Sequence, residues 1–100
     1  MARYVLDHRH QPGECAVVFA SWRGFESPLR RHVALGSCSS GGHAIWWQVE
    51  AGDAAEALAQ LPRYVAERTT ATPVSEVEIP CPAYESGHAA FTGCRPRAGR

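Results

Sequence analysis

The sequence predicts an α+β domain built on a four-stranded antiparallel sheet. Two observations carry this prediction: apolar side chains alternate with polar ones in some segments, as in strands, and recur every three to four residues in others, as in helices. These segments follow one another as strand, helix, strand, strand, helix and strand, and turn-forming residues separate them. One hundred residues are enough for one modest hydrophobic core. We therefore expect one folded domain, over residues 1–80.

The composition is that of an ordinary folded domain. Hydrophobic residues make up 45% of the chain and charged residues 20%, whereas disordered chains are poorer in apolar and richer in charged residues. The formal net charge is zero, so we expect neither nucleic acid nor a membrane surface as a partner. No apolar run approaches the roughly 20 residues of a membrane span, and the N-terminus lacks the apolar core of a signal peptide. We therefore expect a cytoplasmic protein whose four cysteines are reduced.

The first strand and the first helix are predicted within residues 3–23. Polar and apolar residues alternate from Arg3 to His10, which predicts a strand. One face of this strand carries Tyr4, Leu6, His8 and His10. Helical spacing then predicts a helix over residues 13–23, after Pro12 at a position that suits a first helical turn. The apolar face of this helix consists of Cys15, Val18, Phe19 and Trp22.

A hairpin is predicted in the middle of the chain. Residues 32–37 and 44–50 are short segments with β-branched or aromatic residues, and they flank a turn rich in serine and glycine, as strands of a hairpin do. In the second strand, alternation places Ile45, Trp47 and Val49 on the face that we expect beneath the helices. Trp46 and Gln48 then lie on the opposite face.

The second helix and the last strand follow the hairpin. Asp53 and Glu56 have the spacing of a capping box, which predicts a helix start. Pro62 should kink or restart this helix because proline cannot continue the helical hydrogen bonds. The apolar stripe of the helix consists of Ala54, Leu58, Leu61 and Val65. Alternation over residues 74–79 predicts the last strand, and the Pro/Gly-rich residues 81–100 are expected to form a tail.

The order β-α-β-β-α-β is that of split β-α-β folds of the ferredoxin-like kind. In such a fold the strands lie in the order 4-1-3-2 and both helices cover one face of the sheet. In element order and length, residues 3–79 resemble the small dimeric α+β barrel proteins, which include muconolactone-isomerase-like enzymes. Some small nickel-binding actinobacterial proteins are similar in architecture. The resemblance implies a homodimer whose second subunit covers the open sheet face, where we expect Trp46 and Gln48.

A ferredoxin-like sheet would bring together three segments that carry imidazoles and thiols. The end of the first strand, the start of the first helix and the hairpin turn meet at one edge, and they carry His8, His10, Cys15, Cys38 and His43. Imidazole and thiolate together favour a transition metal, Zn or Ni, over Mg or Ca. Our leading hypothesis is therefore metal binding by the three histidines, with Cys38 or Cys15 assisting. Cys15 also fits an apolar core position, and His32 is expected to be solvated.

Two other classes of function fit the same residues. The protein could be an enzyme or binding module for a small-molecule ligand, with His8 or His10 as general acid or base. The partner carboxylate would then come from Glu14 or Glu76. Cys15, near a helix N-terminus, could act as a nucleophile or redox thiol. The third class is an interaction subunit without chemistry of its own.

Two further motifs have simpler interpretations beside the functional one. The backbone N–H groups of residues 39–42, Ser-Ser-Gly-Gly, could bind an anion, although such a sequence is more typical of a plain turn. Cys81, His88 and Cys94 could form another metal site, although their spacing is irregular and a solvated tail is the better explanation.

Overall fold

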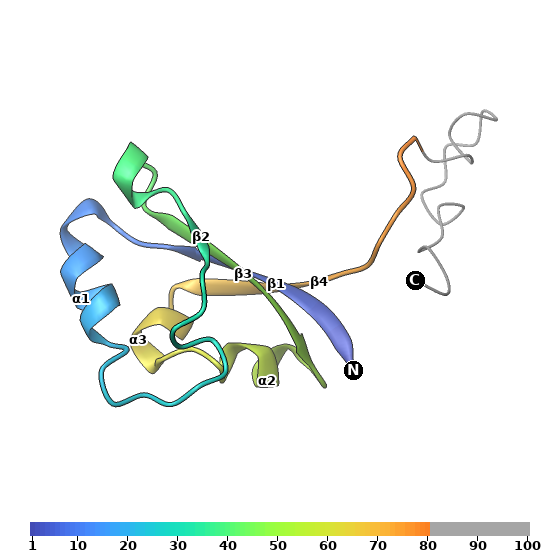
Figure 1. The fold of residues 1–100 in the computed structure, drawn as a ribbon, viewed down its shortest axis with the longest axis horizontal. Helices are drawn as coiled ribbons and strands as arrows, with labels where there is room; N and C mark the ends of the chain where they lie inside the picture. The colour runs from blue at the N-terminus through green and yellow to red at the C-terminus, as the bar shows by residue number, and fades with distance from the viewer. Residues whose placement is uncertain (81–100) are drawn as a thin grey trace.

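The computed structural model describes residues 1–80, and over this range the chain is an α+β domain with one four-stranded antiparallel sheet (Figure 1). The strands are β1 (Ala2–Arg9), β2 (Leu35–Gly36), β3 (Ala44–Ala51) and β4 (Thr69–Val74). The helices are α1 (Cys15–Ala20), α2 (Ala54–Leu58) and α3 (Arg63–Ala66), with two 3-10 turns, η1 (Pro12–Glu14) and η2 (Cys38–Ser40). Within residues 1–80, no helix is long and apolar enough to cross a membrane.

The strands β1 and β3 lie in the middle of the sheet, as the sequence predicted. The order from edge to edge is β2-β3-β1-β4, and every neighbouring pair is antiparallel. All eight residues of β1 pair with β3, so that His8 lies opposite Ile45 and Leu6 opposite Trp47. On its other edge β1 pairs with β4, where His8 lies opposite Thr69. The end of β1 is thus held on both sides.

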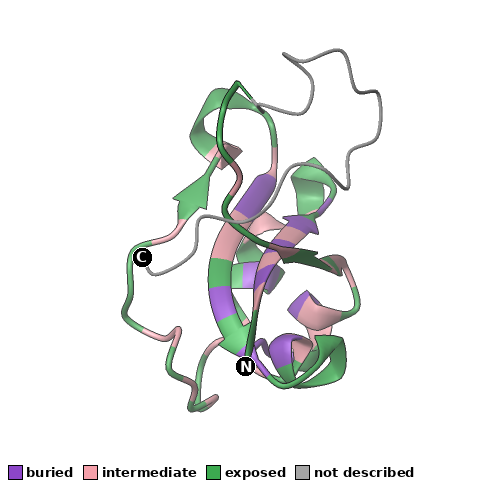
Figure 2. Ribbon diagram, turned by 90° about the vertical axis from the view of Figure 1, so that its right-hand side faces the viewer, coloured by how far each residue is buried: buried purple, intermediate pink, exposed green. Residues whose placement is uncertain are grey.

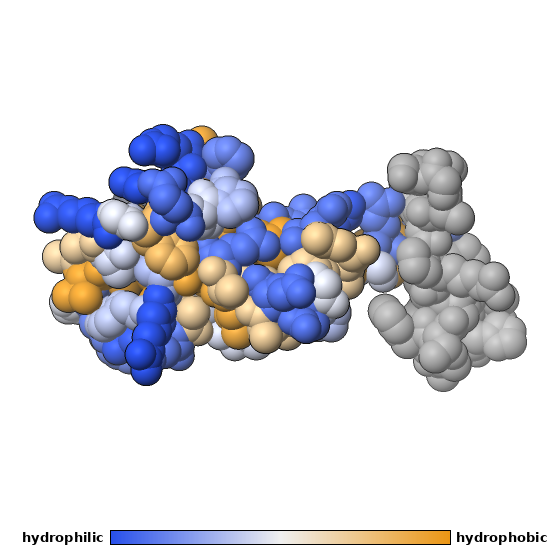
Figure 3. All heavy atoms as spheres, turned by 90° about the horizontal axis from the view of Figure 1, so that it is seen from below, coloured by the Kyte–Doolittle hydropathy of each residue, from blue (hydrophilic) through white to orange (hydrophobic). Residues whose placement is uncertain are grey.

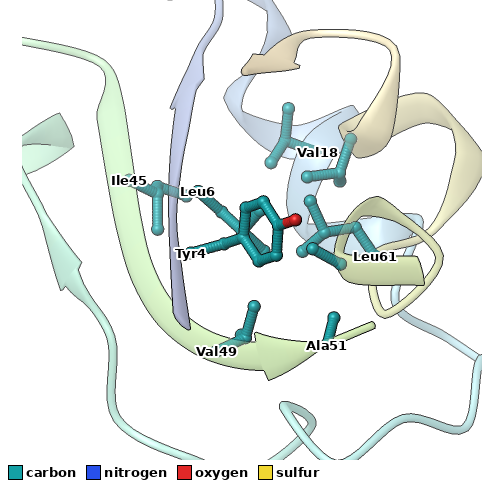
Figure 4. Close-up of a cluster of buried hydrophobic side chains, with 9 residues drawn as sticks. Tyr4, Leu6, Val18, Ile45, Val49, Ala51 and Leu61 are labelled. Carbon is teal, nitrogen blue, oxygen red and sulfur yellow. The ribbon is translucent and has the colours of Figure 1, made fainter. Parts of the chain in front are cut away.

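The hydrophobic core lies between this sheet and the helices. Alternate residues of β1 face it, and Tyr4, Leu6 and His8 are all buried. Figure 2 shows buried residues gathered along the two central strands. The helices add Val18 from α1, Ala57 from α2 and Val65 from α3, which all belong to one cluster with the core residues of the strands. Figure 4 shows the cluster, with Val18 and Leu61 facing the strands across Tyr4 and Leu6. The helices therefore share one face of the sheet.

The two edge strands differ from the sequence prediction. The predicted strand over residues 32–37 is reduced to Leu35–Gly36, and His32 belongs to the preceding turns, in which Arg30 N donates to Ser27 O and His32 N to Leu29 O. The predicted strand over residues 74–79 is wrong, since β4 spans Thr69–Val74. Three of the six β4 residues are threonine and three are exposed, so this edge strand has too few apolar side chains for an alternation to be detected.

Both predicted helices are shorter in the structure. The first consists of η1 followed by α1, and Phe19, expected in the core, is 58% exposed, whereas Val18 is fully buried. The second starts as predicted, because Asp53 Oδ1 accepts a hydrogen bond from Glu56 N at 2.8 Å. The break at Pro62 is also confirmed: α2 ends before it and α3 begins after it.

Some of the predicted core positions also shift. Ala54, expected in the apolar stripe of the second helix, is exposed, and Ala57 is buried in its place. Trp47, expected beneath the helices, is only partly buried and packs at the margin of the core against Trp22, with ring centroids 6.0 Å apart. Trp46 is also partly buried. The predicted tail, with Cys81, His88 and Cys94, lies outside the described residues.

Candidate metal centre

Four imidazole and thiol side chains meet at one end of the sheet. His10 follows β1, Cys15 is the first residue of α1, Cys38 lies in η2, and His43 immediately precedes β3. One potential ligand atom from each of them lies within 4.8 Å of the other three. The structure therefore brings together four of the five residues that the sequence singled out for metal binding.

Three of the distances within this group match those between ligands of one tetrahedral ion. His10 Nε2 lies 3.3 Å from Cys15 Sγ and 3.5 Å from Cys38 Sγ. Cys15 Sγ lies 3.2 Å from His43 Nδ1. Zinc bound to nitrogen at about 2.0–2.1 Å and to sulfur at about 2.3 Å in a tetrahedron separates N and S ligands by roughly 3.5 Å. The donors therefore fit a transition-metal ion with little rearrangement.

The group is set into the protein without being sealed. His10 is 8% exposed, while Cys15, Cys38 and His43 are partly buried. Burial raises the pKa of the Cys38 thiol, and the neighbouring Cys15 raises it further. The Cys38 thiolate therefore forms more readily when a cation lies beside it, and a bound divalent metal supplies that positive charge.

His8, which the sequence proposed as a ligand, lies outside this group of four and contacts it through His10. His8 Nε2 is 3.0 Å from His10 Nδ1. The other nitrogen of His8, Nδ1, lies 3.1 Å from Thr69 Oγ1 and 3.3 Å from Val65 O. Since Thr69 Oγ1 donates its own proton to Val65 O at 2.6 Å, both oxygens can accept a hydrogen bond from His8 Nδ1–H.

These contacts determine which nitrogen of the His8 and His10 rings carries the proton. Burial lowers the pKa of His8, which keeps the ring neutral, with one proton. With that proton on Nδ1, His8 Nε2 accepts from His10 Nδ1–H. His10 Nε2 then carries a lone pair directed at the two thiols. The sequence showed the alternation that buries both histidines on one face but could not show which of them reaches the thiols.

The loop that carries Cys38 and His43 is closed by its own hydrogen bonds. Ser37 N donates to Ala44 O at 2.8 Å, and Gly42 N donates to Ser37 O at 2.8 Å. Within it, His43 has a φ of 51°, in the left-handed region that residues other than glycine seldom adopt. Such strain recurs at functional sites, where the surrounding structure holds it in place. One further bond, from His10 N to His43 O at 3.1 Å, joins this loop to the end of β1.

A second set of contacts holds the turn that carries Cys15. Glu14 Oε1 accepts from Gln11 N at 2.8 Å. The other oxygen, Glu14 Oε2, accepts from Tyr64 Oη at 2.8 Å and from Arg68 Nε at 3.2 Å. The Arg68 guanidinium also lies 3.7 Å from the centre of the Tyr64 ring. Glu14 thereby ties η1 to α3 and fixes the start of α1.

The remaining sequence-based candidates lie away from this chemistry. Glu14 pairs with Tyr64 and Arg68 as above, and Glu76 lies 3.8 Å from Arg3, so each proposed partner carboxylate pairs with a group other than a histidine. His32 is exposed, as expected.

The anion-binding hypothesis for residues 39–42 is not supported. The N–H groups of Ser40, Gly41 and Gly42 donate to carbonyl oxygens within the loop. These are the groups that would have held an anion, so the segment is a turn.

One signal in the sequence points to this set of four more directly than topology does. His10 and Cys15 are separated by four residues, and so are Cys38 and His43, in the opposite order. In both cases a 3-10 turn, η1 or η2, lies within the span and returns the chain so that the two side chains approach each other. The mirrored spacing is visible only when both pairs are considered together.

No protein family model, no curated protein and no solved structure matches the chain. The chemistry of the site therefore rests on its own donors. Two imidazoles and two thiols at these distances are compatible with the binding of a metal ion.

Proposed function

We propose that this protein binds one Zn²⁺ ion through His10, Cys15, Cys38 and His43, and that the ion has a structural role. The observation that carries the proposal is the convergence of these four donors from three segments. It also accounts for the strained backbone of His43, which places that ring beside Cys15.

The donor set favours zinc and a closed site. Two thiolates and two imidazoles in a tetrahedron are the ligands of structural zinc, whereas catalytic zinc usually has three protein ligands and one open position. Nickel and copper(II) more often take square-planar or tetragonal sites. With four protein donors the ion has no position left for a substrate, so it ties segments together instead of performing a reaction.

The β2–β3 hairpin, one of the segments that the ion would tie together, has a short ladder. The hairpin pairs β2 with β3 through only Leu35 with Trp46 and Gly36 with Ile45. A metal held by Cys38 and His43 on this hairpin and by His10 and Cys15 at the end of β1 would secure it. Because an unfolded chain lacks the preformed site, the binding free energy stabilises the fold.

Metal analysis tests the proposal. Protein purified without a histidine tag should contain about one zinc per chain, and cobalt(II) in its place should give the intense visible absorption of tetrahedral thiolate coordination. Cys15→Ser and Cys38→Ser should each abolish most of the binding. His32→Ala should not, because His32 is exposed and outside the group.

A second control addresses the residues beyond position 80. The double variant Cys81→Ser/Cys94→Ser should keep its zinc if the metal is held by the group of four. The proposal would be contradicted if the protein contained no metal or if this double variant lost its zinc. It would also be contradicted if His32→Ala lost as much zinc as Cys15→Ser and Cys38→Ser. A square-planar nickel spectrum with tighter binding of Ni²⁺ than Zn²⁺ would contradict the choice of metal.

We also propose the ferredoxin-like fold and a homodimer formed through the open face of the sheet. The support is the central position of β1 and β3, the helices on one face, and the partly buried Trp46 with Gln48 on the other. Trp46→Glu should convert a dimer to a monomer, as measured by light scattering. A monomeric wild-type protein at micromolar concentration would refute the dimer. We propose a cytoplasmic location because the zinc site requires reduced thiols, and thiols stay reduced in the cytoplasm.

A further inference from the structure

A pocket of about 470 Å³ lies next to the proposed zinc site, between α1, the connection after it and the β2–β3 hairpin. This volume is in the range of small-molecule binding sites. Its walls are mainly apolar and aromatic: Phe19, Trp22, Leu29, Ala34, Ile45 and Trp47. The rings of Trp22 and Trp47 are 6.0 Å apart at an angle of 46°, so they pack against each other and together offer an aromatic surface to the pocket.

The polar part of the pocket carries positive charge. Arg30, Arg31 and His32 line it, and none of its lining residues is acidic. Arg30 is partly neutralised, because its Nη1 lies 3.0 Å from Glu26 Oε2 outside the pocket. In the described part of the chain, Arg31 has no acidic partner. Arg31 is therefore the cation left to bind an anionic group.

The backbone at Arg31 adds an independent observation. Its φ is 70°, in the left-handed region, where a side chain with a Cβ is strained. A turn of this kind is ordinarily made with glycine, which carries no such cost. The chain instead holds an arginine at this strained position, on the lining of an aromatic pocket. Strain of this type is retained where the side chain has a function.

We propose that this pocket binds a small aromatic carboxylate, with its ring against Trp22 and Trp47 and its carboxylate bound by Arg31. The guanidinium matches a carboxylate because it donates two parallel hydrogen bonds. The aromatic walls exclude a strongly hydrated anion such as free phosphate, which has no apolar surface to bury. Figure 3 views the molecule from the side on which the helices lie, where apolar and charged groups adjoin.

This site is separate from the metal chemistry although the two adjoin. Cys38 lines the pocket and is also one of the four proposed zinc ligands, so its sulfur forms part of the pocket wall. The ligand itself contacts arginine and tryptophan side chains and needs no position on the ion. Metal analysis and ligand titration therefore report on the two proposals independently.

Calorimetry with two matched probes tests the proposal. The full-length protein as purified is titrated with 2-naphthoate and with 2-naphthalenemethanol, which has the same ring but no charge. We expect naphthoate to bind about tenfold more tightly, the ratio that corresponds to about 1.4 kcal/mol. Arg31→Gln should remove this preference, and Ala34→Leu should weaken both probes because it fills the pocket.

The control is Arg23→Gln, which removes an exposed arginine that does not line the pocket. It should leave the affinity for naphthoate unchanged. Arg23 and Arg31 are exposed and Ala34 is partly buried, and a circular dichroism spectrum checks that each variant is folded. No binding of naphthoate at millimolar concentration would overturn the proposal. Equal affinity for the two probes, or an equal effect of Arg23→Gln and Arg31→Gln, would do so as well.

Discussion

His8 Nε2 and His10 Nδ1 lie 3.0 Å apart inside the domain, and this contact divides the two histidines between different roles. His8 is fully buried, and its other nitrogen is held by Val65 and Thr69. It therefore orients the His10 ring, whose outer nitrogen faces the two thiols. Metal-binding histidines commonly have such a partner, which fixes the tautomer and raises the basicity of the ligand.

The first prediction concerns this contact. His8→Phe removes the acceptor for His10 Nδ1–H and should lower zinc affinity by about 10–100-fold while the stoichiometry at saturating zinc stays at one per chain. His8→Gln is the matched control, because its amide oxygen can occupy a position near that of Nε2. It should retain most of the affinity, as measured by competition with a zinc chelator.

Two outcomes would contradict the role assigned to His8. If His8→Phe folds normally but binds no zinc at any concentration, His8 is a ligand, as the sequence alone suggested. If both variants bind like the wild type, the contact does not influence the metal.

The second prediction concerns the loop that presents Cys38 and His43. A Cβ at Gly42 would collide with Ser37 Oγ and lie 2.8 Å from Ser37 Cβ. The same Ser37 Oγ accepts a hydrogen bond from Ala44 N at 3.1 Å, so moving it opens the loop. Gly42→Ala should therefore destabilise the protein by about 1–3 kcal/mol, the usual cost of overpacking, and weaken zinc binding.

Gly13→Ala is the control for this loop variant. A Cβ at Gly13 meets no atom within 4 Å, and its φ is not in the left-handed region. It should be neutral or stabilising by about 0.4–1 kcal/mol, because alanine restricts the unfolded chain. Urea denaturation measures both variants, and equal destabilisation by the two would argue against the collision.

The fold was predictable where a local rule acts alone. The pair Asp53 and Glu56 marks a helix start through hydrogen bonds between neighbours, and Pro62 lacks the N–H that a continuous helix needs. The alternation at Leu6 and His8 likewise follows from burial of one face of a strand. The strand β4 was missed because it lies at the sheet edge beside β1 and half of its residues are threonine, so it lacks the apolar alternation of the central strands.

The site was predictable to the extent that topology determines it. Placing the end of the first strand next to the hairpin turn was enough to bring His10 and His43 together. The role of His8 depends on the position of Thr69, in a strand that the sequence placed elsewhere. The pocket depends on the turns at Arg30 and Arg31, in a connection for which the sequence predicted no defined structure. Neither the role of His8 nor the pocket could therefore be predicted from local sequence patterns.

The third prediction is that zinc protects two thiols and stabilises the fold. In zinc-loaded protein Cys15 and Cys38 should resist alkylation by iodoacetamide, since a metal-bound thiolate is not free to react. Chelation should expose both, as measured by mass spectrometry of the peptides. Free zinc at about 1,000 times its dissociation constant should add about 4 kcal/mol to the free energy of unfolding. Unchanged alkylation after chelation would exclude these thiols as ligands.

The fourth prediction is that zinc affinity falls as the pH is lowered. Histidine must be neutral and cysteine deprotonated to bind zinc, so protons compete with the ion. The decline should begin at higher pH than in a site made of carboxylates, because the two thiols bind protons strongly and burial raises the pKa of Cys38. Zinc competition assays at pH 8, 7 and 6 measure this. An affinity independent of pH over this range would contradict thiolate coordination.

The last prediction concerns Glu14, which joins the turn before Cys15 to α3. Hydrogen bonds from Gln11 N and Tyr64 Oη, together with the Arg68 charge, lower the pKa of Glu14 in the folded protein. A carboxyl whose pKa is lower in the folded state stabilises that state above its unfolded pKa, about 4.5. This contribution is lost as the pH falls through the lower folded value.

Glu14→Gln should therefore reduce stability at pH 7 and have a smaller effect at pH 3, as measured by urea midpoints of the metal-free protein. Glu26→Gln is the comparison, since its side chain is 80% exposed and pairs only with Arg30 on the surface, an interaction worth little in water. A gap between wild type and Glu14→Gln that stays constant from pH 7 to pH 3 would show that the charge of Glu14 contributes nothing. Glu14 would then hold the turn that positions Cys15 through hydrogen bonds that do not depend on its charge.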